Sequence, residues 1–516
     1  MSSSDSRGGY TGESAQQGSL ARNTVFNLVT QLLLIAVSLW SFPILVKGIS
    51  AEGFGLLSLV WVLVGYFSLL DLGVSRAITK FVAESVTAGD MARVRLIVWT
   101  SLMLSVIIGF AVATAIYMSR GLAVTHLFNV TSSIRDEGST SIALAAVGIP
   151  FMLANGMLRG TQAAFQRFDM VNGFQAVMGG MQWIGSVVLV WCGGGVKEIV
   201  LLTVLVRVLL LVAALGMLPR LIPGFFSGIR LWDNAAARKL LSFGGWVTVS
   251  QVISPLFLYA DRLLIGSLVS LAAVAYYTVP QEAVSRMLIV PLSLTVALYP
   301  VFSAHSAVPG DAKRAGAIYL RSVKYIALLM LPVTLLFVIH ARGILSVWMG
   351  NDFAGQSSVA FQILVVGVFF NSLAQVPTTL LHAFGRPDLT AKFHLLEFPV
   401  MLGLNMALIP VLGIAGAAIA WSLRVVMDAV MLFVAARPYV ERSRSGPVRR
   451  YVSPGVAGLL VLIVLLATVL LFVDDIPGKA IATVALAFIY AAWVWRFGLD
   501  SVDKGFLYQM RTKILG

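Results

Sequence analysis

The residues best suited to chemistry in this sequence are charged side chains that interrupt long apolar stretches. A charge within the hydrocarbon zone of a membrane costs at least about 2.5–3.5 kcal/mol, so such residues tend to face a bundle interior or a watery cavity. Their positions therefore indicate where a polar site lies. They are Asp71, Arg76, Arg159, Arg207, Asp261, Arg262, Glu282, Arg286, Glu397, Arg424 and Asp428.

Two pairs among these charges have the spacing of one helical turn. Glu282 and Arg286 stand at i,i+4 with the acid first, which is the more favourable order, and Arg424 and Asp428 share this spacing in reverse. Each pair could simply neutralise itself within its own helix. Each could equally serve a substrate or a coupling ion, and the sequence leaves both readings open.

Asp261 and Arg262 are adjacent in sequence and therefore point about 100° apart on a helix. They need partners on other helices. The orientation of the helices predicted below places them in the outer half of the membrane together with Glu282 and Arg286. We expect these four residues to share one polar cluster.

The buried arginines suit an anionic ligand. A guanidinium cannot be deprotonated in a protein, and its planar fork of donors matches phosphate oxygens bidentately. Arg76 and Arg159 lie near the inner ends of their helices, where snorkelling of the side chain to the interface is the simpler explanation. Arg207 lies mid-helix, and it either lines a cavity or pairs with an acid on a neighbouring helix.

Motifs for catalysis and cofactors are missing from the sequence. The Gly478-Lys479 pair lacks both the upstream glycine and the following Ser or Thr of a phosphate-binding loop, so ATP hydrolysis is not expected. The five histidines show no H-E-x-x-H spacing, and the single cysteine, Cys192, can form neither an intramolecular disulfide nor a multi-cysteine zinc site. We predict that the chain is not an enzyme and has no catalytic residues, no metal site and no cofactor.

The composition predicts an all-α polytopic membrane protein. Of the 516 residues 59% are hydrophobic and only 12% are charged, against about 25% charged residues in soluble domains. About fourteen apolar runs are each long enough to cross a hydrocarbon core. They are residues 20–46, 54–80, 96–118, 140–160, 173–192, 198–218, 244–267, 271–303, 319–341, 358–383, 393–412, 414–436, 454–473 and 479–497.

The basic residues predict the orientation of these helices. The net charge of +14 is spread in small groups between apolar runs rather than gathered on one basic face, which argues against nucleic acid as a partner. Lys and Arg concentrate in cytoplasmic loops of membrane proteins. Most of the 37 Lys and Arg residues fall on alternate connections if the N-terminus is inside. Both termini are therefore predicted to be cytoplasmic.

The basic connections also suggest a plan of six, six and two helices. A shift of 221 residues lays Ala51 on Ala272, Phe81 on Phe302 and Ser85 on Ser306, a weak sign of two related, pseudo-symmetric six-helix lobes. The predicted segments are a disordered cytoplasmic tail (1–19), an N-lobe of helices one to six (20–218), a cytoplasmic connection (219–243), a C-lobe of helices seven to twelve (244–436), a basic cytoplasmic loop (437–453), two extra C-terminal helices (454–497) and a cytoplasmic tail (498–516).

Short motifs in both lobes carry a family resemblance. They lie at residues 51–55 (AEGFG), 69–77 (LLDLGVSRA), 80–84 (KFVAE), 259–266 (YADRLLIG), 275–279 (AYYTV), 297–300 (ALYP) and 413–418 (GIAGAA). With these motifs the sequence resembles Wzx-type polysaccharide flippases, which share a superfamily with multidrug and toxin extrusion transporters and lipid II flippases. The match spans roughly residues 20–436.

The resemblance implies two lobes around a central cationic cavity that opens alternately to either side of the bacterial inner membrane. The implied cargo is an undecaprenyl-pyrophosphate-linked oligosaccharide for surface polysaccharides such as O-antigen, and transport is expected to be cation-coupled. Implied partners are this lipid-linked oligosaccharide and membrane lipids, with polysaccharide polymerase and glycosyltransferases as candidates. The alternatives are a cation-coupled multidrug exporter, a lipid II flippase or a scaffold for a synthesis complex.

Two sets of residues are the candidates for this site. An anion that crosses a low-dielectric membrane needs compensating positive charge, and nearby carboxylates would hold the arginines or bind the coupling cation. The predicted substrate-binding residues are Arg76, Arg262, Arg286 and Arg424. The predicted ion-coupling or charge-pairing residues are Asp71, Asp261, Glu282 and Asp428.

Overall fold

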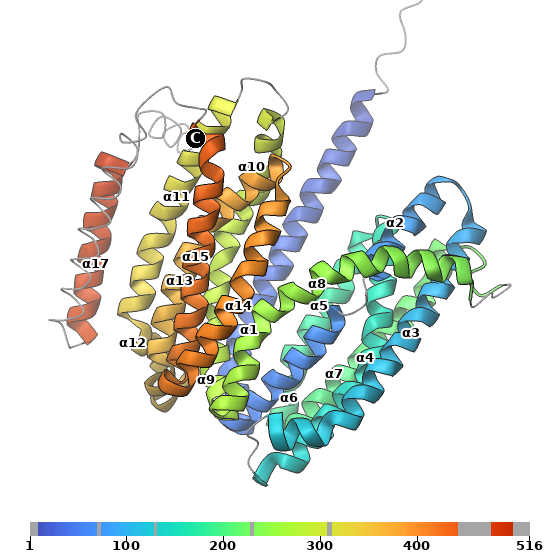
Figure 1. The fold of residues 1–516 in the computed structure, drawn as a ribbon, viewed down its shortest axis with the longest axis horizontal. Coiled ribbons are helices and arrows are strands. Elements are labelled where there is room, and N and C mark those ends of the chain that lie inside the picture. The colour runs from blue at the N-terminus through green and yellow to red at the C-terminus, as the bar shows by residue number, and fades with distance from the viewer. Residues whose placement is uncertain are drawn as a thin grey trace, which may run out of the picture. The chain divides into compact units, whose positions relative to one another are not determined.

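The computed structural model describes residues 9–69, 74–127, 132–227, 232–306, 312–441 and 476–498. Every regular element in these ranges is a helix, and no strand occurs in them (Figure 1). Ten of the described helical segments are long and apolar enough to cross a membrane, and residues 481–496 form a shorter apolar helix. The predicted fold class, an all-α polytopic membrane protein, is confirmed.

The chain forms two compact units, residues 1–275 and 276–516. The helices of the first unit are α1 (Gly9–Leu69), α2 (Val74–Thr87), α3 (Met91–Leu122), α4 (Arg135–Ala164), α5 (Phe168–Gly180), α6 (Ser186–Trp191), α7 (Val196–Leu221) and α8 (Asn234–Leu268). A π-helical turn, η3 (Met181–Gly185), joins α5 and α6 into one span, and α9 (Leu271–Ser285) begins in this unit.

Helix α1 joins two of the predicted helices. Its halves meet at Ser50, whose φ of 67° and ψ of 164° are not helical. The Ser50 hydroxyl accepts a hydrogen bond from the Gly53 amide at 3.2 Å and so caps the second half. Ser270 makes the equivalent bond with the Ala273 amide at 3.1 Å, where α9 begins. This recurrence lies one residue from the predicted shift of 221 and supports related helix pairs.

The N-terminal end differs from the sequence prediction. Residues 1–8 of the predicted disordered tail lie outside the described residues, but α1 already begins at Gly9. A membrane-spanning helix extends outward at little cost, because each added residue gains a hydrogen bond once the helix has been nucleated. The predicted division between a tail (1–19) and the first membrane-spanning helix stays a prediction.

Helix α4 is central to the first unit and packs against α1, α2, α3 and α7. Gly156 and Gly160 form a G-x-x-x-G spacing on α4, which allows helix backbones to approach closely. A Cβ atom at Gly160 would lie 2.5 Å from the Ser75 carbonyl oxygen of α2. The Thr79 hydroxyl donates a hydrogen bond to the Gly160 carbonyl at 3.0 Å. This tight contact fixes the position of α4 and of Arg159, which lies within the motif.

Helix α8 packs against α1, α2 and α3 in the first unit. Asp233 caps its start, since the Asp233 carboxylate accepts a hydrogen bond from the Ala236 amide at 2.8 Å. The predicted lobe boundary lies at the longest polar connection, residues 219–243. The length of a connection shows where helices are separated along the chain, but it does not show which helices pack together. The division of the chain into lobes 20–218 and 244–436 stays a prediction.

The second unit contains the rest of α9 and the following helices. These are α10 (Ile289–Ser306), α11 (Ala312–Ile339), α12 (Ala341–Met349), α13 (Asn351–Ala383), α14 (Pro387–Leu412), α15 (Ile414–Glu441) and α17 (Ile476–Trp493). Helix α13 is central here and packs against α10, α11, α12 and α15, while α11, α13 and α15 run side by side (Figure 1).

A tight turn brings α14 and α15 together. Gly413, with a φ of 58°, separates the two helices, and a left-handed backbone of this kind favours glycine. A Cβ atom at Gly416 would lie 2.3 Å from the Leu408 carbonyl oxygen. Ala417 and Ala418 beside it are fully buried. The small residues at 413–418 therefore let α14 and α15 pack in close contact.

Helix α17 corresponds to the last predicted helix and contacts α11. The Tyr490 hydroxyl donates to the Leu328 carbonyl at 2.6 Å, and His340 Nε2 lies 2.7 Å from the Thr483 hydroxyl. Helix thirteen of the prediction, residues 454–473, lies outside the described residues, as do most of the basic loop and the C-terminal tail.

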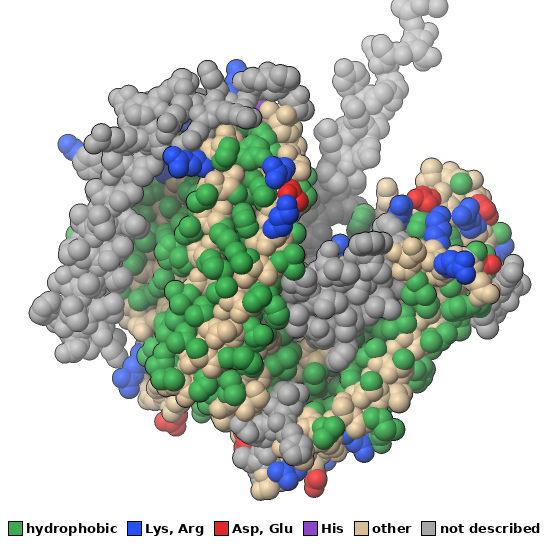
Figure 2. Space-filling model, in the orientation of Figure 1, with side chains coloured by type: hydrophobic (Ala, Val, Ile, Leu, Met, Phe, Trp, Pro, Cys, Tyr) green, Lys and Arg blue, Asp and Glu red, His purple; other side chains and the backbone are tan. Residues whose placement is uncertain are grey.

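The surface of each unit agrees with a membrane environment. On the face shown in Figure 2, hydrophobic side chains cover the flanks of the helices, and Lys and Arg gather towards the helix ends. Large apolar residues such as Leu209 and Phe110 are more than half exposed. Exposed apolar bands bounded by charged ends are expected of a protein that faces lipid.

Candidate functional site

A cavity of about 330 Å³ lies between α4, α5 and α7 in the first unit. Helix α5 has no buried residue, so it forms a loosely packed wall. The lining combines apolar side chains with polar ones whose groups are mostly hydrogen-bond donors. The lining residues are Met152, Asn155, Leu158, Arg159, Gln162, Phe174, Gln175, Met178, Gly179, Arg207, Leu210 and Ala214.

Two arginines from different helices meet in this cavity. Arg159 extends from α4 and Arg207 from α7, and they lie close enough for their positive charges to interact. The Asn155 amide of α4 donates to the Arg207 carbonyl at 2.8 Å and holds the two helices together. No carboxylate among the described residues lies within salt-bridge distance of the Arg207 guanidinium. Like charges placed together in a membrane cavity point to an anionic ligand.

Nothing in the sequence pattern indicates that these two residues lie together. From the sequence alone, snorkelling from an inner helix end is the simpler explanation for Arg159, and Arg207 either lines a cavity or forms an ion pair. The structure places both on the cavity. Because they stand on different helices, no local spacing links them. The G-x-x-x-G motif around Arg159 was the available signal that this part of α4 is packed against other helices.

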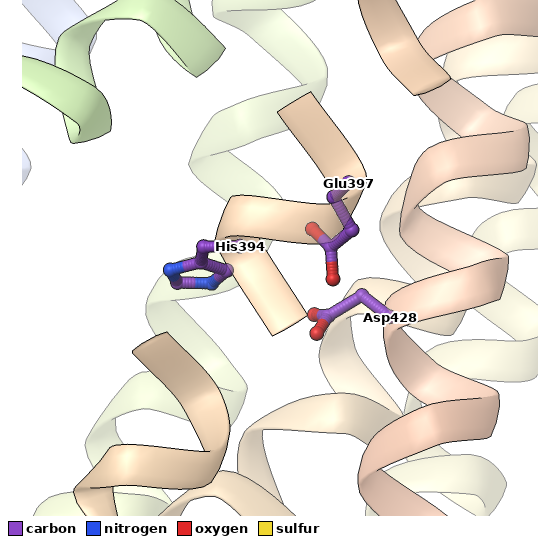
Figure 3. A group of neighbouring side chains, drawn as sticks. All are labelled: His394, Glu397 and Asp428. Atoms are coloured by element: carbon purple, nitrogen blue, oxygen red, sulfur yellow. The ribbon is translucent and has the colours of Figure 1, made fainter. Parts of the chain in front are cut away.

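A second polar cluster lies in the second unit between α14 and α15 (Figure 3). Glu397 of α14 has no exposed surface, and its Oε2 accepts a hydrogen bond from Arg424 Nη1 of α15 at 3.1 Å. Asp428, one turn beyond Arg424, directs its carboxylate towards that of Glu397, as Figure 3 shows. His394 lies one turn before Glu397 on α14 and is exposed. We call these four residues the α14–α15 cluster.

The α14–α15 cluster contains a partner that the i,i+4 spacing does not indicate. Arg424 and Asp428 stand one turn apart on α15, and in the structure Arg424 also donates to Glu397 of the neighbouring helix. The sequence shows Glu397 as a charge within a helix, but neither Glu397 nor His394 is among the predicted site residues. The close packing at Gly416 brings α14 and α15 together, and this contact could not be located from i,i+4 spacing.

The α14–α15 cluster also offers three ligand atoms, from His394, Glu397 and Asp428, that lie within 4.8 Å of one another. This set fits a metal ion poorly. Hard cations such as Na⁺, Mg²⁺ and Ca²⁺ prefer several oxygen ligands, and one of the three ligands here is an imidazole. Arg424 already holds one oxygen of Glu397 with its own positive charge.

The four residues of one predicted cluster are divided between the two units. Asp261 and Arg262 belong to the first unit, and Glu282 and Arg286 belong to the second. Asp261 and Arg262 are both buried in α8, and the Asp261 carboxylate accepts a hydrogen bond from the Arg262 amide at 2.8 Å. The Arg262 guanidinium carbon lies 5.8 Å from the centre of the Tyr259 ring. The Glu282–Arg286 pair is confirmed, with 3.2 Å between Oε2 and Nη2.

The remaining predicted site residues are spread over the chain. Arg76 is exposed on α2, and Asp71 lies outside the described residues. Arg76, Asp261 and Arg262 belong to the first unit, and Glu282, Arg286, Arg424 and Asp428 belong to the second. A single cavity that contains all eight stays a prediction.

Comparison with known proteins assigns the family. A model of polysaccharide biosynthesis proteins matches residues 44–358, more than half of the chain. The chain belongs to this family. A protein of Shigella flexneri, described as a proposed O-antigen transporter, is 25% identical over 414 residues, which cover 80% of this chain and 97% of that protein. The resemblance to Wzx-type polysaccharide flippases is thereby confirmed, as is the prediction of a transporter rather than an enzyme.

Solved structures of two transporter groups share the fold. The lipid II flippase MurJ in an inward closed conformation aligns with a TM-score of 0.68 at 11% identity, over 92% of this chain and 99% of that chain. An inward-facing multidrug transporter of the MATE family gives a TM-score of 0.64 at 13% identity, over 80% and 96%. At these identities the likeness concerns the fold alone. The chain is a multi-pass membrane protein that shares its fold with these two transporters.

Proposed function

We propose that the chain is a flippase for polyprenyl-pyrophosphate-linked oligosaccharide repeat units. It would move them from the cytoplasmic to the periplasmic leaflet of the bacterial inner membrane for surface polysaccharide synthesis, by cation-coupled alternating access. Family membership and the relative in Shigella flexneri support a polysaccharide-related cargo. Both termini would be cytoplasmic, and polysaccharide polymerase and glycosyltransferases are the proposed partners besides membrane lipids.

The observation that carries this proposal is the pair of arginines in the cavity of the first unit. Arg159 and Arg207 present two guanidiniums, with the amides of Gln162 and Gln175 close by. A pyrophosphate carries more than one negative charge and several acceptor oxygens, so two donor forks can share it. The same charges would repel a cationic drug, which disfavours the multidrug-exporter alternative.

The other predicted residues would act along the same route. Arg76, Arg262, Arg286 and Arg424 are proposed to contact the cargo in turn, because an anion needs positive charge along the whole path through the membrane. Asp71, Asp261, Glu282 and Asp428 would hold these arginines, or bind the coupling cation, when the cargo is absent.

The test replaces arginines in cells and measures surface polysaccharide together with the accumulated lipid-linked intermediate. We expect Arg159→Ala, Arg207→Ala, Arg262→Ala and Arg286→Ala to lower export at equal protein levels. The Lys variants should recover only part of it, because the charge survives but the bidentate fork does not. Arg167→Ala is the matched control, since Arg167 is about half exposed and pairs locally with Asp169 at 2.8 Å.

Undiminished export in the Arg159→Ala/Arg207→Ala double variant would overturn the role of this cavity. Normal surface polysaccharide in cells that lack the whole protein, with no related transporter present, would overturn the proposed function itself.

A further inference from the structure

One oxygen of Glu397 has no hydrogen-bond donor. The Glu397 side chain is completely buried; Arg424 binds Oε2, while Oε1 has no hydrogen-bond partner in the described structure. Leaving a buried charged acceptor without a donor costs more than about 1–3 kcal/mol, so such an atom calls for a missing partner. The Glu397 carboxylate that carries this atom lies beside a second carboxylate, that of Asp428 (Figure 3).

A single proton would satisfy this geometry. Two carboxylate groups that face each other present only acceptors, and one proton between them converts the contact into an O–H···O hydrogen bond. The charge balance leads to the same result. With both acids ionised and Arg424 positive, the cluster carries one net negative charge, whereas one bound proton makes it neutral. Close carboxylates in a low-dielectric site share a proton for this reason.

A sodium ion would balance the charge equally, but the coordination does not suit it. The cluster offers one oxygen from each of the Glu397 and Asp428 carboxylates and an imidazole nitrogen, whereas a hard cation seeks a larger set of oxygen ligands. A proton requires two acceptors only. Other titratable groups nearby are His394 on α14 and His382 on α13, whose Nε2 lies 3.0 Å from the Thr390 hydroxyl.

We propose that Glu397 and Asp428 share one exchangeable proton and that this proton is the coupling ion of transport. His394 is exposed on the same helix one turn from Glu397, so it can pass the proton between water and the pair. This inference rests on the proposed transport function. It adds the identity of the ion and the residues that bind it.

The proton would control the packing of α14 against α15. Its loss leaves a net negative charge beside the completely buried Glu397 side chain, and this state is stabilised when water enters or Arg424 moves towards Asp428. Gly416 holds the two helices at close backbone contact, so we expect such a change in the cluster to alter the packing between them. Proton release is thereby linked to a change in shape within the second unit.

Infrared difference spectroscopy of the purified protein in lipid tests the shared proton without any cargo. At neutral pH we expect a protonated carboxyl C=O band that shifts in D₂O. Both E397Q and D428N should abolish it, because the amide supplies the missing donor and the remaining acid pairs with Arg424. D388N is the matched control on α14, since Asp388 is 43% exposed and pairs with Arg386 and Lys392; the band should remain.

Three results would overturn the shared proton: no such band in the wild-type protein, persistence of the band in both single variants, or its replacement on addition of sodium.

Export in cells then tests the coupling. E397Q and D428N should reach the membrane and lose export, while D388N keeps it, and full export by E397Q and D428N would refute coupling through this pair. A wild-type band combined with failed transport of lipid-linked glycans would instead count against the proposed function.

Discussion

Two ion pairs of nearly equal length should differ widely in their contribution to stability. Arg424 and Glu397 are 3.1 Å apart and are 12% and 0% exposed, whereas Arg286 and Glu282 are 3.2 Å apart and are 37% and 32% exposed. Removing one partner of a buried pair leaves an uncompensated charge and costs about 3–5 kcal/mol. The corresponding loss for a pair that reaches water is about 0–1 kcal/mol.

We therefore expect Arg424→Met to lower the free energy of unfolding by about 3 kcal/mol or more, and Arg286→Met by less than about 1 kcal/mol. Adding Glu397→Gln to Arg424→Met should recover most of the loss, because no unpaired carboxylate then remains at that position. Adding Glu282→Gln to Arg286→Met should change little. The four variants and both single Gln variants form two double-mutant cycles.

The assay is equilibrium unfolding in mixed detergent micelles, followed by the helical signal and by tryptophan fluorescence. Equal losses for Arg424→Met and Arg286→Met would refute the reasoning, because they would mean that Glu282 and Arg286 face hydrocarbon rather than water. Failure of Glu397→Gln to rescue Arg424→Met would show that the Arg424 side chain stabilises the fold through packing rather than through its charge.

Three further predictions concern the packing and topology. Gly160→Ala should destabilise the protein by about 1–3 kcal/mol, because the new Cβ would lie 2.5 Å from the Ser75 carbonyl oxygen. The control is Gly216→Ala, which should be neutral or stabilising because nothing lies within 4 Å of its Cβ. Thermal unfolding in detergent compares the two variants, and equal effects would contradict the close contact of α2 and α4. Tyr490→Phe should lower the free energy of unfolding by about 0.5–1.5 kcal/mol, because it removes the hydrogen bond to the Leu328 carbonyl. The same assay measures this change, and an unchanged stability would show that α17 is held by apolar contacts alone. A tag at Asp233 should be accessible from the cytoplasm and a tag at Asn351 from the periplasm, because the distribution of Lys and Arg requires it; labelling of Asn351 from the cytoplasm would reverse the predicted orientation.

Composition and periodicity predicted much of the fold because lipid solvation imposes strong constraints on sequence. The uncharged runs located nearly every described helix, including the α13 and α15 spans, since a helix must present apolar residues over its whole length to cross a membrane. The same runs could not show that α8 packs with the first unit or that α1 begins at Gly9. Both depend on helix packing and helix propagation, which leave no periodic signature.

The candidate site was predictable only where its partners stand one turn apart on one helix. Glu282 and Arg286 met this condition, and their pairing is confirmed. Arg424 pairs with Glu397 on α14, and Arg159 of α4 lines the same cavity as Arg207 of α7. These contacts depend on tight helix approaches at small residues such as Gly416 and Gly160, and a single sequence does not state which helices those residues bring together.

The measurement that tests the central claim most directly is translocation in inside-out membrane vesicles. A labelled lipid-linked oligosaccharide, supplied on the outer face, which corresponds to the cytoplasmic side, is followed by its loss of accessibility to an added glycosidase. We predict that vesicles with the wild-type protein protect the label with time and that vesicles with the Arg159→Ala/Arg207→Ala variant at equal abundance do not. Label that stays fully accessible in wild-type vesicles, or that is protected equally in vesicles without the protein, would contradict the account.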